Sequence, residues 1–224
     1  MCWRIWRWSM SKALRLAVTK GRLLKKSIEM MEAVGFDCSA VREPGRRLIL
    51  PVLDKAGHIY CEVVLAKARD VITYVEHGVC DLGIVGKDSI LEWGRSFYEV
   101  LDLGFGACRF ALAVKQGEDF YGKLHHRVVA SKYTNVTARY FQQQGVDVEI
   151  IHIDGSVELA PILGLADGIV DIVETGDTLR ENGLVPIETV AQISARLIVN
   201  VGSMKTKHSD VRGFVENCEA ALGR

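Results

Sequence analysis

The sequence predicts an α/β protein whose strands are mostly parallel. Short runs rich in β-branched residues alternate along the chain with amphipathic helical segments, which is the pattern of repeated strand-helix units. Polar turns that contain glycine follow several of these runs, and such turns end regular elements. Hydrophobic residues make up 49% of the 224 residues, which is ample for the core of one large or two small domains.

The first predicted strand-helix unit begins at residue 14. Residues 14–19 have the apolar pattern of a buried strand, and residues 23–34 have that of an amphipathic helix ended by Gly35. The turn between them holds Lys20 and Arg22, and it follows the carboxyl end of a strand, where open α/β sheets bind ligands. Cations at a helix start oppose the helix dipole, so this placement favours a binding role over ordinary solvent-exposed side chains.

The following segments continue the alternation. A β-hairpin is predicted over residues 47–65, with its turn at residues 54–57. Arg69 and Asp70 open a predicted helix, and residues 81–88 combine a strand with a glycine-rich turn. The other predicted strands are residues 99–103, 110–114, 128–131, 148–153 and 168–173, and further strands are predicted within residues 188–201. The other predicted helices are residues 89–93, 135–144 and 209–222.

The most informative stretch is the polar loop of residues 174–178. It follows the buried strand 168–173 and precedes a helical turn that Gly183 closes. The amides of such a loop and of the first helical turn have no partner within the chain, so they form a cradle for an anion, with phosphate favoured. An ordinary strand-turn-helix with surface acids explains the same residues equally well.

Acidic residues around this loop narrow the choice of ligand. Asp171 and Glu174 would repel a phosphate, but carboxylates accept hydrogen bonds from a ribose diol and coordinate Mg²⁺. The combination therefore predicts a phosphorylated ribose. Asp177 lies inside the loop, and its side chain is expected to point away from the phosphate. The predicted phosphate contacts are Thr175, Gly176 and Thr178.

The residues around the loop resemble the signature of the ATP phosphoribosyltransferases, the enzymes of the first step of histidine biosynthesis. In that family this segment binds phosphoribosyl pyrophosphate, and similar residues run through almost the whole chain from Leu14. The matching positions are Glu158, Pro161, Gly164, Ala166, Asp167, Ile169, Val170, Asp171, Thr175, Gly176, Thr178 and Leu179.

The resemblance implies a two-lobed fold similar to that of the periplasmic binding proteins, with the active site in the inter-domain cleft. We expect a discontinuous domain I over residues 10–103 and 186–224. Domain II is expected over residues 104–185 and carries the phosphoribosyl pyrophosphate loop.

The resemblance also implies roles for individual residues. Lys20 and Arg22 are implied to be catalytic, through the charge of the pyrophosphate or of the ATP phosphates. The implied nucleotide-binding residues are Gly21, Arg69, Asp70, Arg109 and Lys132, although a surface ion pair would equally explain the arginine at 109. The implied phosphoribosyl pyrophosphate contacts are Glu158, Asp171, Glu174, Thr175, Gly176, Asp177 and Thr178.

The implied reaction joins N1 of the ATP adenine to C1 of phosphoribosyl pyrophosphate and expels pyrophosphate. Because N1 carries a free lone pair, no general base is expected. The rate is expected to come from the orientation of two bound substrates and from stabilisation of the leaving charge. Mg²⁺ is expected as a substrate-bound ion near Asp171, without a dedicated protein site.

Composition favours a cytoplasmic protein that binds neither nucleic acid nor membrane. Its 28 lysine and arginine residues balance 28 aspartate and glutamate residues, so no long-range attraction for a polyanionic surface is expected. The six cysteines show no Cys-x-x-Cys spacing, which is typical of reduced thiols.

The length of the chain resembles that of the short form of the family. Such members lack a regulatory domain and require a subunit similar to a histidyl-tRNA synthetase. We therefore expect a homodimer within a hetero-oligomer, with ATP and phosphoribosyl pyrophosphate as the small-molecule partners.

Residues 1–9 differ from the rest of the chain because they are basic and hold three of the four tryptophans. They are predicted to be a disordered extension upstream of a natural start at Met10, with a small membrane or partner anchor as the alternative.

Two other functions fit the same pattern. One is a non-catalytic small-molecule-binding or sensing module of the same fold, because fold does not determine function. The other is a phosphoribosyltransferase that acts on a different base.

Overall fold

The computed structural model of the protein describes residues 13–122 and 126–223. These residues form two compact units. Unit 1 takes the described chain up to Ile84, together with residues 96–101 and the chain from Leu197, whereas unit 2 takes residues 85–95 and 102–196. The predicted extension at residues 1–9 lies outside the described residues.

Unit 1 is built on a six-stranded sheet with the strand order β2-β3-β1-β4-β11-β5. The central strand β1 pairs in parallel with both β3 and β4, and β2 pairs antiparallel with β3, which confirms the predicted hairpin. The strands are β1 (Leu14–Thr19), β2 (Ile49–Leu53), β3 (Ile59–Ala66), β4 (Leu82–Gly86), β5 (Tyr98–Asp102) and β11 (Ala195–Val199).

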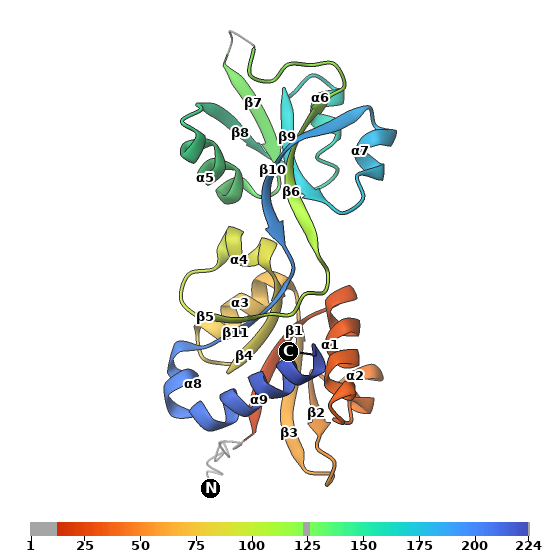
Figure 1. Cartoon of the computed structure of the whole chain (residues 1–224), viewed down its shortest axis with the longest axis vertical. Helices are drawn as coiled ribbons and strands as arrows, with labels where there is room; N and C mark the ends of the chain where they lie inside the picture. The colour runs from red at the N-terminus through yellow and green to blue at the C-terminus, as the bar shows by residue number, and fades with distance from the viewer. Residues whose placement is uncertain (1–12, 123–125, 224) are drawn as a thin grey trace, which may run out of the picture. The chain divides into compact units, whose positions relative to one another are not determined.

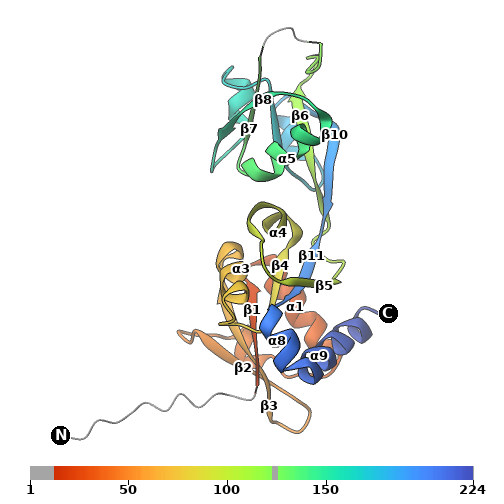
Figure 2. The same ribbon diagram turned by 90° about the vertical axis from the view of Figure 1, so that its left-hand side faces the viewer.

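Helices flank this sheet on both sides. Helices α1 and α9 lie side by side on one side, and α3 lies on the other (Figures 1 and 2). The sheet between them is buried on both faces, as a parallel sheet covered by helices requires, and three consecutive residues of β1, at 16–18, are fully buried. The helices are α1 (Arg22–Ala33), α2 (Ser39–Arg42), α3 (Ala68–Glu76), α8 (Val201–Thr206) and α9 (His208–Ala221).

Unit 2 is built on a five-stranded sheet with the order β10-β6-β9-β7-β8. Strand β7 pairs in parallel with β8 and β9, whereas β6 pairs antiparallel with β9 and β10, so the sheet is mixed. The strands are β6 (Cys108–Lys115), β7 (Arg127–Ser131), β8 (Val148–His152), β9 (Gly168–Val173) and β10 (Leu184–Ile193), and the helices are α4 (Lys87–Trp93), α5 (Thr134–Gln144), α6 (Leu159–Ile162) and α7 (Asp177–Glu181).

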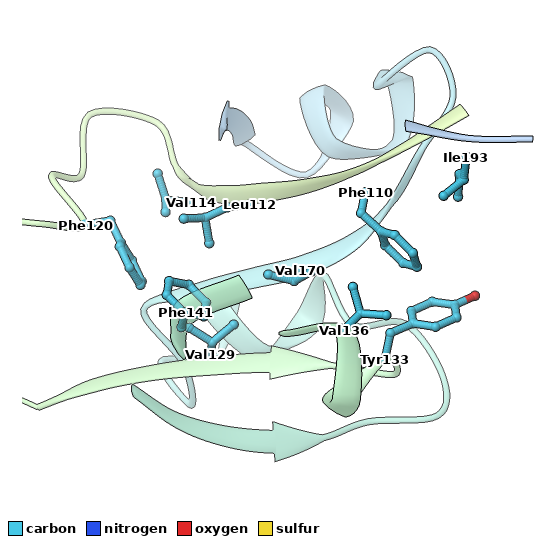
Figure 3. Packing of buried hydrophobic residues seen from close by; sticks show 10 residues of the cluster. All are labelled: Phe110, Leu112, Val114, Phe120, Val129, Tyr133, Val136, Phe141, Val170 and Ile193. Atoms are coloured by element: carbon cyan, nitrogen blue, oxygen red, sulfur yellow. The ribbon is translucent and has the colours of Figure 1, made fainter. Parts of the chain in front are cut away.

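The main core of unit 2 lies between this sheet and α5 (Figure 3). Phe110 of β6 packs edge-to-face against Tyr133, with ring centroids 4.8 Å apart, and Phe141 of α5 packs against Phe120 at 5.8 Å. Such aromatic pairs add to the hydrophobic stabilisation that their burial supplies. This core fixes the beginning of α5 against β6 and β9, the strands that carry the candidate site.

The return of the chain to unit 1 differs from the predicted crossing at residue 186. Strand β10 pairs along its length with β6 and places Ile193 in the core of unit 2, and the chain then continues into β11 (Figure 2). Helix α4 also belongs to unit 2, although it lies in the chain between β4 and β5 of the other sheet. Apolar periodicity predicts a strand but not its pairing partner, which explains the difference.

Candidate functional site

One edge of the unit 2 sheet gathers the residues predicted to bind a phosphorylated ribose. Strands β7 and β9 are parallel, so the residues that follow Ser131 and Val173 lie at the same edge. Strand β6 runs in the opposite direction and begins at this edge, where Arg109 pairs with Val173. Lys132, Arg109 and the loop after β9 are therefore brought together, as expected for ligand sites at the carboxyl ends of strands.

Asp171 and Glu158 form an acidic pair at this edge. Asp171 is half-buried, and burial raises the pKa of its carboxyl group, an effect that the negative charge of Glu158 increases and that Lys132 opposes. Loss of hydration and a neighbouring like charge both disfavour the ionised carboxylate. A divalent cation or a ribose diol would relieve this unfavourable environment.

The loop after β9 has the backbone geometry that the sequence predicts. Gly176 is the N-terminal cap of α7 and has φ of 82°, in the left-handed region that favours glycine. Thr178 is exposed, and its hydroxyl takes part in no hydrogen bond with any residue that the structure describes. This hydroxyl is thus available to a ligand.

The side chain of Asp177 is held by two neighbouring residues. Its carboxylate accepts a hydrogen bond of 2.6 Å from the Thr175 hydroxyl and also pairs with Arg180. These two partners hold the pKa of Asp177 below its usual range. The loop therefore contains its own carboxylate, that of Asp177, to which the Thr175 hydroxyl donates.

The corresponding edge of the unit 1 sheet gathers the other candidate residues. Strands β1 and β3 are parallel, and Thr19 pairs with Ala66, so the residues that follow these two strands share one edge. Lys20 and Arg22 follow β1, while Arg69 and Asp70 lie in the first turn of α3. All four side chains are exposed.

Gly21 shapes the turn between Lys20 and Arg22. It has φ of 92° and ψ of −137°, a combination that only glycine adopts without strain. The Lys20 amide donates to the carbonyl of Ala66 at 3.1 Å. The turn is thus fixed by glycine and by the neighbouring strand end, and its two cationic residues are exposed.

Sequence reasoning missed one residue at the unit 2 edge. Tyr133 is 9% exposed, and its hydroxyl has no hydrogen-bond partner within the described chain. Figure 3 shows the hydroxyl pointing away from the core cluster. Burial raises the pKa of this phenol, with Asp88 and Asp171 adding negative charge, so the hydroxyl is a proton donor at neutral pH.

Asp171 and Glu158 are two residues of this edge that could hold a metal ion. Within residues 13–122 and 126–223, no group of three histidine, cysteine or acidic side chains is arranged to hold an ion. Asp171 and Glu158 provide hard oxygen ligands, and Mg²⁺ is commonly held by one or two carboxylates together with substrate phosphates.

Four cysteines are buried and unsuited to nucleophilic chemistry. Burial raises the pKa of the thiols of Cys38 and Cys218 to about 12 and that of Cys80 to about 11, and it raises that of Cys61 further. A thiol with so high a pKa is not ionised at neutral pH, and the thiolate is the reactive form.

No helix in the described part of the chain is both long enough and apolar enough to span a membrane.

The protein is thus a two-unit α/β protein in which a loop that contains hydroxyl groups and glycine lies beside paired carboxylates. Two sulphonate-binding proteins share the fold at 12% identity. The aliphatic sulphonate-binding protein of Escherichia coli has a TM-score of 0.56 over 94% of this chain and 72% of its own, and the alkanesulfonate-binding protein of Xanthomonas axonopodis has a TM-score of 0.51.

The family follows from closer similarities. The family model described as ATP phosphoribosyltransferase matches residues 67–220. The ATP phosphoribosyltransferase of Clostridium kluyveri is 50% identical over 211 residues, or 94% of each chain, and that of Clostridium acetobutylicum is 50% identical over 96% of this chain and 98% of its own. A structure titled as the ATP phosphoribosyl transferase (HisG:HisZ) complex of Thermotoga maritima matches with a TM-score of 0.78 at 33% identity, covering 94% of this chain and 98% of that one. The chain belongs to the ATP phosphoribosyltransferase family.

Proposed function

We propose that the protein transfers the phosphoribosyl group of phosphoribosyl pyrophosphate to N1 of the ATP adenine, the first step of histidine biosynthesis. The observation that carries this proposal is the gathering of Glu158, Lys132, Asp171 and the 174–178 loop at one edge of the unit 2 sheet, in a chain of this family. The carboxylates of Asp171 and Glu174 match a ribose diol, and the loop matches its phosphate.

Unit 2 supplies the binding of the sugar phosphate. The amides and hydroxyls of Thr175, Gly176 and Thr178 hold the 5′-phosphate, while Asp171 and Glu174 hold the ribose hydroxyls or the ion bound to them. Binding of the phosphate requires Thr175 to release Asp177, to which it donates in this structure. Glu158 lies close enough to Asp171 to influence its pKa and shares the same ligand.

Unit 1 supplies positive charge. Lys20 and Arg22 contact the pyrophosphate or the ATP phosphates, and Gly21 allows the backbone to approach them closely. The nucleotide contacts that we propose are Arg69 and Asp70 among the residues of unit 1, and Arg109 and Lys132 among those of unit 2. Mg²⁺, when bound with the substrate, neutralises phosphate charge, and Asp171 is the ligand that this chain offers it.

The chemistry is a displacement at C1 of the sugar. The lone pair of adenine N1 forms the new bond to C1 while the bond from C1 to the pyrophosphate oxygen breaks, and the pyrophosphate leaves with the bonding electron pair and with inversion at C1. No side chain has to create the nucleophile. The protein therefore contributes by orienting two substrates and by stabilising the leaving charge.

The relative of known structure from Thermotoga maritima is titled as a complex of two different subunits. On this ground we propose that the protein also works with a regulatory subunit, one that resembles a histidyl-tRNA synthetase, around a homodimer of catalytic chains in the cytoplasm.

A pyrophosphate-release assay tests the function. The chain is assayed alone and with the regulatory subunit, in the presence of phosphoribosyl pyrophosphate, Mg²⁺ and one nucleotide at a time. The expected result is release that depends on ATP and is not supported by CTP or UTP, which lack adenine N1. Binding of phosphoribosyl pyrophosphate without turnover in either mixture would instead indicate a sensing module.

A further inference from the structure

Glu92 of α4 is a buried carboxylate that the sugar-phosphate site does not use. It is 7% exposed, and its side chain lies against the beginning of α5. Its two oxygens accept hydrogen bonds from the backbone amides of Asn135 at 3.1 Å and of Val136 at 3.0 Å. The side-chain amide of Asn135 donates back to the carbonyl of Glu92 at 3.2 Å.

These contacts make Glu92 the cap of a helix distant in sequence. The first amides of a helix lack partners within it, and a residue just before the helix usually accepts from them. Tyr133 occupies that position in α5 and makes no side-chain capping bond. The carboxylate of Glu92 replaces the missing cap, and it also interacts favourably with the positive end of the helix dipole.

Lys132 and Tyr133 come directly before the capped turn of α5. The Ser131 hydroxyl accepts from the Tyr133 amide at 2.9 Å and donates to the Val170 carbonyl of β9 at 2.6 Å. Glu92 holds the other side of the Lys132–Tyr133 turn, through the amides of Asn135 and Val136. The turn is thus fixed at both ends relative to β9, which carries Asp171.

Helix α4 is itself anchored to unit 2. The side chain of Leu91 packs against the core cluster that contains Phe110 and Phe141, and Glu92 is one of the two buried residues of the helix. The capping hydrogen bonds therefore join α4 and α5, two elements that are both packed against the core of unit 2.

We propose that Glu92 is a positioning residue, which caps α5 and thereby holds the Lys132–Tyr133 turn in register with Asp171 for binding of the sugar phosphate. This inference rests on the proposed function of that edge. Because the carboxylate of Glu92 accepts from the amides of Asn135 and Val136, these two amides are not available to a substrate anion.

The test compares Glu92→Gln with a matched control, Val148→Ala. Glutamine keeps the shape of the side chain, but its amide nitrogen replaces one acceptor and meets a backbone donor. Val148 lies in β8 and is half-buried against the same core, so its truncation lowers stability without touching the turn. Both variants are assayed in the active assembly for the thermal midpoint, for kcat and KM, and for binding of phosphoribosyl pyrophosphate in the absence of ATP.

The expected result for Glu92→Gln is a rise of about tenfold in KM and in the dissociation constant for phosphoribosyl pyrophosphate, because small displacements of binding groups are costly. The KM for ATP changes little, Glu92→Asp recovers part of the affinity, and Val148→Ala lowers the thermal midpoint with an unchanged KM. If Glu92→Gln and Val148→Ala lose the same stability and have the same KM for phosphoribosyl pyrophosphate, the positioning role of Glu92 is overturned and the proposed function stands. Wild-type protein that neither binds nor turns over phosphoribosyl pyrophosphate would overturn both.

Discussion

Thr178 offers the sharpest test of the phosphate-binding loop, through the substitution Thr178→Ala. Its hydroxyl has no hydrogen-bond partner in the described chain, and its side chain is exposed. The alanine variant therefore loses nothing that the fold requires, and its thermal midpoint is expected to stay the same. A loss of ligand affinity can then be assigned to the ligand contact itself.

The magnitude follows from one hydrogen bond to a charged group. Such a bond contributes about 1.5–3 kcal/mol, and about 1.4 kcal/mol corresponds to a factor of ten in affinity. We therefore expect the dissociation constant for phosphoribosyl pyrophosphate to rise about ten- to a hundredfold, whereas that for ATP stays within a factor of two.

Calorimetric titration of the purified variant measures both constants, and Thr178→Ser, which keeps the hydroxyl, serves as the control. The serine variant is expected to bind nearly as tightly as the wild type. Unchanged affinity in Thr178→Ala would refute the assignment of the 5′-phosphate to this loop.

Three further predictions concern the same edge of unit 2. Asp177→Asn removes the anion that occupies Thr175, so KM for phosphoribosyl pyrophosphate should fall a few-fold in steady-state assays; an increase would show that Asp177 contacts the ligand. Gly176→Ala meets only Val173, at an ordinary 3.7 Å, so its cost should be the backbone strain of about 1–2 kcal/mol, measurable by denaturant unfolding, and an unchanged stability would contradict the left-handed geometry. Asp171→Asn should stabilise the protein while weakening substrate binding, because the ionised carboxylate is unfavourable in the fold. The pKa of Asp171 is raised in the folded protein, so the free energy of unfolding of the wild type falls as pH rises from the ordinary aspartate pKa through the raised one. Unfolding curves of Asp171→Asn should lack this fall. Identical pH profiles for the two proteins would contradict the unfavourable burial of the Asp171 charge.

Much of the fold could be predicted because local pattern determines it. The buried run that became β1 and the amphipathic segment that became α1 both follow apolar periodicity, and glycines mark their ends. The short helix α6 was missed because one turn of helix containing Pro161 is too short to show a period. The partner of β10 was missed because pairing depends on contacts far away in the sequence.

The residues of the candidate site could be proposed from the sequence only where they lie close together in it. Asp171 and the hydroxyl loop could be singled out because they are close together in sequence and their chemistry points to one ligand. The capping role of Glu92 had no such signal, because it depends on a helix that begins more than 40 residues later. Likewise, only the structure shows that Tyr133 is 9% exposed and that its hydroxyl has no partner in the described chain.

Nuclear magnetic resonance can identify the bond that the reaction forms. The active assembly is incubated with ATP labelled with ¹⁵N at N1, phosphoribosyl pyrophosphate labelled with ¹³C at C1, and Mg²⁺. We expect a direct coupling between the two labels to appear in step with the release of one pyrophosphate for each bond formed. Release of pyrophosphate without that coupling, or coupling to a different acceptor nitrogen, would contradict the proposed reaction.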